Sequence, residues 1–99
     1  MVDPTREEGE DEAPIAATWE QLAPVFARGD LVYVATDLDL MDVAAAFAAD
    51  DRDRVAAWMA AGAIAVVRDA QALVWAGQPE LGFRFVIRQP FVLAQPVVS

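Results

Sequence analysis

Three aspartates in one short segment are the first residues whose types and spacing could support chemistry. Asp37, Asp39 and Asp42 lie within six residues, and carboxylates this close together could supply oxygen ligands to a hard divalent cation. A calcium loop, however, needs about twelve residues, a central glycine and a closing glutamate. Asp39 is also a good N-cap, and Asp42 would then favour the positive end of the helix that follows. We therefore expect helix capping in this segment, with a metal site as the alternative.

Most other side chains that enzymes use are missing from this chain. It contains no histidine, cysteine or lysine, and its one serine is Ser99, so hydrolytic, redox and Schiff-base chemistry lack their usual groups. Tyr33 and the threonines have no base in the sequence to activate them. We therefore predict a protein that is not an enzyme, uses no cofactor and has no small-molecule substrate.

Two arginines and three tryptophans are the remaining candidates for a binding role. Arg84 and Arg88 would share one face of the last strand, where a positive stripe could hold a phosphate or an acidic partner segment. A solvated sheet face explains the same pair without any ligand, and we favour that interpretation. Trp19 and Trp58 fall on apolar helix faces and are expected in the core, whereas Trp75 could belong to a lid or an interface.

The net charge of −9 is distributed unevenly along the 99 residues. Residues 1–13 hold six acids and one arginine, and residues 14–99 hold ten acids and six arginines. The acidic start without aromatic residues predicts a disordered tail over 1–13, and the remainder predicts a single domain over 14–99. The longest uncharged stretch, residues 55–67, is shorter than the roughly 20 residues that cross a bilayer. We expect a cytoplasmic protein without membrane contacts.

The first 35 residues predict a helix and then a strand. Pro14 suits the first turn of a helix, and Gly29 suits the left-handed position that ends one. Pro24 lies inside this helix, so we expect a kink or a break there. The β-branched segment 31–35 predicts a short buried strand. The apolar stripe of the helix consists of Ile15, Trp19, Leu22 and Phe26.

The middle of the chain predicts two helices joined by a turn. The first begins at Asp39, the turn contains Asp50 and Asp51, and the second ends at Gly62, which is the pattern of a helix-turn-helix. Nucleic-acid binding depends on basic side chains that neutralise phosphates. Residues 50–54 contain three carboxylates beside two arginines, so we do not expect this segment to bind nucleic acid.

The last third predicts a strand over 64–67, a short helix over 70–75 capped by Asp69, and an alternating strand over 83–94 that is interrupted at Pro90. The element order is that of a winged helix in which residues 69–81 replace the wing. The sequence therefore predicts an α+β, winged-helix-like domain of three main helices on a small three-stranded sheet formed by 31–35, 64–67 and 83–94.

Several spaced motifs also resemble a known family. The resemblance covers roughly residues 12–95 and is to the small bacterial family called domain of unknown function 2288, which implies a short single-domain bacterial protein but brings no activity and no functional residues. The motifs are Trp19-x-x-Leu22-x-Pro24-x-Phe26-Ala27-x-Gly29, Leu38-Asp39-Leu40-x-x-Val43, Asp50-x-x-x-x-Val55-x-x-Trp58-x-x-x-Gly62, Asp69-x-Gln71-Ala72-x-x-Trp75 and Gln89-Pro90-Phe91-Val92-Leu93-x-Gln95.

These observations predict a protein-interaction or adaptor domain. Residues 91–95 read as the outer strand of the sheet, and such an edge can pair with another protein or with a second copy of the chain. The alternatives are a helix-turn-helix regulator, an acidic mimic of nucleic acid that binds basic proteins, and a metal-dependent enzyme. The candidate interaction residues are Arg84, Arg88, Phe91, Leu93 and Trp75.

Overall fold

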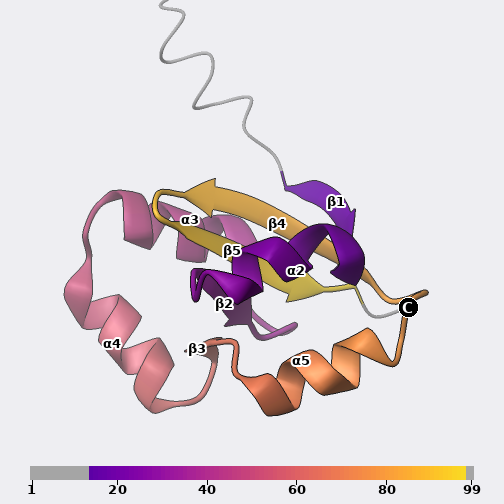
Figure 1. Cartoon of the computed structure of the whole chain (residues 1–99). Coiled ribbons are helices and arrows are strands. Elements are labelled where there is room, and N and C mark those ends of the chain that lie inside the picture. Colours follow the sequence, from indigo (N-terminus) through magenta and orange to yellow (C-terminus); the bar gives the residue numbers. More distant parts are fainter. Residues whose placement is uncertain (1–13, 98–99) are drawn as a thin grey trace, which may run out of the picture.

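A five-stranded mixed sheet with the strand order β1-β4-β5-β2-β3 organises the fold (Figure 1). The computed structural model describes residues 14–97, and the tail predicted over 1–13 lies outside them. Neighbouring strands are antiparallel except β2 and β5, which are parallel. The strands are β1 (Ile15–Thr18), β2 (Leu31–Val34), β3 (Ile64–Val66), β4 (Gly82–Arg88) and β5 (Phe91–Pro96), and the helices are α2 (Trp19–Ala27), α3 (Leu40–Ala48), α4 (Arg52–Ala60) and α5 (Asp69–Ala76).

Helices cover both faces of this sheet, so the core has two halves. Along β2, Leu31 and Tyr33 point to one half, which α2 and α5 cover. Val32 and Val34 point to the other half, which α3 and α4 cover. This alternation follows from the two-residue period of a strand. In Figure 1, α2 lies in front of the β4–β5 hairpin and α3 behind it. The result is a sheet between two helical layers.

The α+β class is right, but the winged-helix-like arrangement of three helices on three strands is wrong. The described residues form four helices on five strands. The segment 69–81, expected in place of a wing, contains the full helix α5, which buries Ala72 and Trp75 in the core. This helix is preceded by Arg68 as its N-cap, without a capping side-chain hydrogen bond, and Asp69 is its first residue rather than its cap.

The N-terminal helix begins later than predicted. Residues 15–18 form strand β1, which pairs with β4, and Ile15 is 57% exposed rather than part of a helical stripe. The helix starts at a capping box, in which Gln21 N–H donates to Thr18 Oγ1 over 3.4 Å and Thr18 N–H donates to Gln21 Oε1 over 2.9 Å. Pro24 lies within the single helix α2, so the predicted break does not occur.

The predicted glycine stops and the predicted helix cap are confirmed. Gly29 and Gly62 have φ of +82° and +75° and follow the ends of α2 and α4, as expected for left-handed helix stops. Asp39 caps α3. No helix among residues 14–97 is both long enough and apolar enough to span a bilayer.

The C-terminal segment is a hairpin and not one interrupted strand. The chain reverses at Gln89–Pro90, and β4 and β5 pair from Arg88↔Phe91 to Phe83↔Pro96. Strand β5 lies between β4 and β2, so the prediction that 91–95 is an outer edge is wrong. Val92, Leu93 and Ala94 are all buried, because helices cover both faces of this strand.

Candidate functional site

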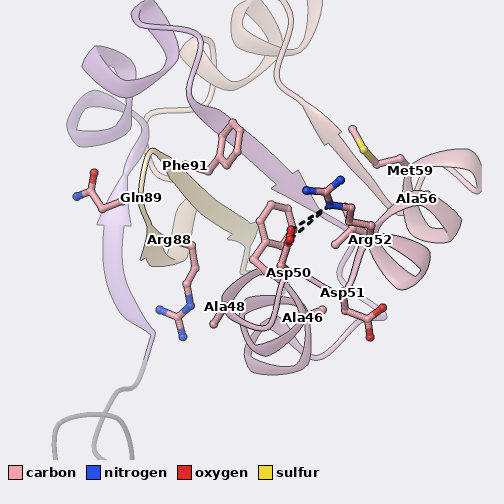
Figure 2. Close-up of a pocket in the computed structure, with 12 residues that line it drawn as sticks. Ala46, Ala48, Asp50, Asp51, Arg52, Ala56, Met59, Arg88, Gln89 and Phe91 are labelled. Carbon is pink, nitrogen blue, oxygen red and sulfur yellow. Dashed lines mark hydrogen bonds and ion pairs between the residues drawn. The ribbon is translucent and has the colours of Figure 1, made fainter. Parts of the chain in front are cut away.

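A cleft opens where the α3–α4 turn and one side of α4 face the β4–β5 turn (Figure 2). Its volume is about 570 Å³, which falls in the ~300–1,000 Å³ range of ligand sites. The cleft is partly open to solvent, so an occupant could enter from one side. Its apolar lining includes Phe47, Val55, Met59 and Phe91.

The aromatic pair in this lining joins two distant parts of the chain. Phe47 from the last turn of α3 meets Phe91 from the start of β5 in an edge-to-face contact, with ring centroids 6.1 Å apart and an interplanar angle of 77°. Both rings are half-buried and pack against the core half under α3 and α4. They therefore form a fixed apolar floor, to which Met59 adds a side chain that is 49% exposed.

The α3–α4 turn places two carboxylates beside this floor. Asp50 has φ of +54°, a left-handed conformation that aspartate tolerates better than most residues. This turn lets Asp51 N–H donate to the Ala46 carbonyl over 2.9 Å. Asp51 in turn caps α4, since its Oδ1 accepts from Arg54 N–H at 3.3 Å. The local backbone requirements of the turn thus bring Asp50 and Asp51 to the cleft.

Two arginines, Arg52 and Arg88, line the cleft together with the two aspartates. Arg52 Nε lies 3.4 Å from Asp50 Oδ2, but the two side chains are 85% and 76% exposed, and exposed pairs of this kind contribute little free energy. In Figure 2 the Arg52 guanidinium reaches across to the Asp50 carboxylate. Residues 50–54 carry three aspartates and two arginines, so a basic group would be attracted to the α3–α4 turn.

Arg88 joins the end of β4 to α3. Its Nε donates to the Ala44 carbonyl over 3.1 Å and its Nη1 donates to the Ile87 carbonyl over 2.9 Å. These bonds fix the position of the β4–β5 turn relative to α3, and hence the width of the cleft between them. Arg88 and Gln89 also contribute to the cleft lining.

The predicted stripe of Arg84 and Arg88 is interrupted by packing. Val86 between them is 3% exposed and lies in the core half under α3. Arg84 is exposed and borders a separate hollow with Thr36, Gln95 and Pro96. The two arginines share one face of β4, as predicted, but they border different hollows on it.

The three remaining candidate interaction residues have different surroundings. Phe91 lines the cleft. Leu93 is 0% exposed and Trp75 is 4% exposed, so both stabilise the core and neither side chain is at the surface. Trp75 contacts the rings of Trp19, Tyr33 and Phe83, with the centroid of Phe83 5.0 Å away.

The aspartate segment has a structural role that the structure shows directly. Asp39 Oδ1 accepts from Met41 N–H at 2.9 Å, which confirms the predicted N-cap, and Asp42 lies in the first turn of α3. Asp37 is exposed in the preceding turn. Over residues 14–97 no three carboxylates are gathered closely enough to hold a metal ion.

The sequence did not predict the cleft, because ordinary packing alone explains each of its apolar residues when that residue is considered singly. Phe47 and Val55 fit the apolar faces of their helices, and Met59, four residues after Val55, fits the same apolar face. The useful signal was the Asp50-Asp51 turn, since two helices that meet at a tight turn leave a hollow beside it. Only the β4–β5 turn, about 40 residues further on, closes that hollow into a cleft.

The model of the family DUF2288, a protein family of unknown function, matches residues 10–96. The NMR solution structure of PA1075 from Pseudomonas aeruginosa is similar, with 32% sequence identity, a TM-score of 0.83, and coverage of 98% of this chain and 89% of that one. No curated protein matches the chain. The matched residues include every described helix and strand, and therefore the cleft.

Proposed function

The chain belongs to the DUF2288 family, as its motifs indicated, and from its structure we propose that it is a protein-interaction domain that binds a segment of another protein in the cleft. The observation that carries this proposal is the combination of a fixed apolar floor, Phe47 against Phe91, with two carboxylates beside it, Asp50 and Asp51. An apolar floor takes an anchoring side chain, and a charged rim selects what lies next to that anchor.

The chemistry of the two parts defines the partner segment. The floor accepts a large apolar side chain, because Met59 and the two phenylalanines present carbon surface that such a chain would remove from water. The rim favours an adjacent arginine or lysine, since Asp50 and Asp51 line it and opposite charges attract most where water is partly excluded. The partner is therefore a basic segment with an apolar anchor.

The helix-turn-helix regulator suggested by the sequence remains an alternative that no contact in the structure favours. Asp51 and Asp53 lie at the start of α4, where a recognition helix would approach phosphates. These carboxylates would repel phosphates and attract basic side chains. We therefore propose a protein segment with basic side chains as the partner.

A selection experiment tests the proposal without a known partner. A displayed library of random peptides is selected on the wild-type protein. We expect the enriched peptides to contain a large apolar residue close to an arginine or lysine. Met59 is 49% exposed, so Met59→Glu should change the cleft with an effect on stability within about ±0.5 kcal/mol.

The strongest enriched peptide is then titrated by fluorescence anisotropy. Met59→Glu should weaken binding by about tenfold or more, because it places a charge on the apolar floor. The double variant Asp50→Asn/Asp51→Asn should weaken binding several-fold and reduce its dependence on salt. Asparagine retains the tolerance for positive φ at the first position and the cap at the second.

The matched control is Glu20→Gln/Asp37→Asn, which changes the net charge by the same amount away from the cleft. It should bind the peptide as the wild type does. Enriched peptides that bind wild type and Met59→Glu equally, or that lack both apolar and basic residues, would refute the proposed function.

A further inference from the structure

Helix α5 has apolar residues on both its inner and its outer face. Ala72 and Trp75 are buried against the sheet, whereas Leu73 is 74% exposed and Val74 is 54% exposed. Ala70, Leu73, Val74 and Gly77 follow one another at steps of three, one and three residues, which places them on one side of the helix. In Figure 1, α5 lies at the periphery of the fold.

A helix that is apolar all round is normally buried on all sides. The sequence of α5, DAQALVWA, contains a single charged residue, Asp69, at its first position. Single exposed apolar residues are common on protein surfaces, but two large adjacent ones on an otherwise uncharged helix face form a patch that another surface should cover.

We infer that this outer face of α5 binds the same face of a second copy of the chain, giving a homodimer in which the two α5 helices lie antiparallel. A two-fold axis between Leu73 and Val74 would bring each Leu73 against its counterpart's Val74, because in such an interface residue i contacts j and j contacts i. The small residues Ala70 and Gly77 would meet at either side and allow the helices to approach closely.

Charge supports a second copy as the occupant. The net charge of −9 opposes association wherever acidic surfaces would meet, and the outer face of α5 is free of acidic side chains from Ala70 to Gly77. Exposed Arg68 precedes this face and exposed Glu80 follows it. In the antiparallel arrangement, the N-terminal end of each α5, with Arg68, lies beside the C-terminal end of the other α5, with Glu80. The two helix dipoles then point in opposite directions, which is favourable.

The contact would be small, so the dimer should be weak. A pair of short helices lies at the low end of the interface sizes found for specific complexes, below about 1,200 Å² in total. We therefore expect a dimer that forms in the micromolar range and dissociates on dilution, and not an obligate one.

Sedimentation velocity of the full chain tests this inference over concentrations from about 1 µM to about 1 mM, which bracket weak association. The wild-type mass should rise from 10.7 kDa toward twice that value. Leu73→Glu should weaken association by at least about tenfold, because it places two like charges across the axis. Ile15→Glu, an equally polar change at a residue outside α5 that is 57% exposed, should dimerise as the wild type does.

A charge exchange tests the antiparallel arrangement separately. Arg68→Glu and Glu80→Arg should each weaken the dimer, and the double variant should restore it because the opposite charges meet again. A wild type that stays monomeric throughout, or a Leu73→Glu variant that associates like the wild type, would overturn the inference. Failure of the double variant to recover would overturn the antiparallel arrangement. Neither result depends on peptide binding in the cleft, so this inference and the proposed function fail independently.

Discussion

Trp75 provides the sharpest test of the packing, because the sequence left open whether it belongs to the core or to an interface. Its side chain is 4% exposed and touches three aromatic rings, with centroid distances of 5.7 Å to Trp19, 6.1 Å to Tyr33 and 5.0 Å to Phe83. Replacing a buried tryptophan by alanine removes these contacts and leaves a cavity, at about 3–5 kcal/mol of unfolding free energy. That is a large part of the roughly 5–15 kcal/mol by which domains are stable.

Urea unfolding followed by far-UV circular dichroism measures this loss at a protein concentration low enough to keep the chain monomeric. With a slope of about 1.5 kcal/mol per M, the midpoint of Trp75→Ala should fall by about 2–3 M. Trp75→Phe retains part of the ring contacts and should fall less, which keeps the test informative if the alanine variant does not fold. Leu73→Ala on the same helix should stay within about 0.5 kcal/mol of wild type, since its side chain is 74% exposed. A loss below about 1 kcal/mol for Trp75→Ala would refute the packing of α5 described above.

Three further changes probe the loops and the cap on either side of α3. Gln95 Nε2 donates to the Ala35 and Leu38 carbonyls over 2.7 and 2.8 Å. Gln95→Leu should therefore lower the free energy of unfolding, measured in urea, by about 1–3 kcal/mol. A change below about 0.5 kcal/mol would count against these hydrogen bonds. Asp39→Ala should cost about 1 kcal/mol through loss of the α3 cap, with Asp39→Ser close to wild type; equal losses in both would contradict the capping role. Asp50→Gly should be more stable than Asp50→Val by about 1–2 kcal/mol in thermal unfolding, because φ is +54° there; equal stability would argue against the left-handed turn.

Local signals in the sequence were sufficient for the middle of the chain. Strand β2, the cap of α3 at Asp39 and the glycine stops at Gly29 and Gly62 each depend on neighbouring residues, and each matches its prediction. At the N-terminus two local signals competed. The spacing of Ile15 and Trp19 favoured a helix from residue 14, but the capping box of Thr18 and Gln21 marked its true start.

The sheet could not be predicted from local signals, because its order depends on pairings between distant segments. Alternation in β4 suggested one solvated face, and Pro90 suggested an interruption within a single strand. Residues 91–94, all apolar, are instead typical of a strand that is covered on both sides. The parallel pairing of Leu31 with Val92 places β5 in the middle of the sheet, and no pattern within either segment indicates that contact.

The placement of the cleft and of α5 leads to a last prediction that depends on both proposals. The cleft is built on the α3–α4 layer and α5 belongs to the α2–α5 layer, so pairing through α5 leaves the cleft of each copy open. A dimer would then hold two clefts and bind a surface densely coated with the selected peptide more tightly than one cleft can, by up to about 10²-fold. Leu73→Glu should remove this gain in surface plasmon resonance while its affinity for the free peptide in solution stays at the wild-type value. If Leu73→Glu also weakened binding of the free peptide, α5 would have to contribute to the cleft itself, and the separation of the two sites by the sheet would be wrong.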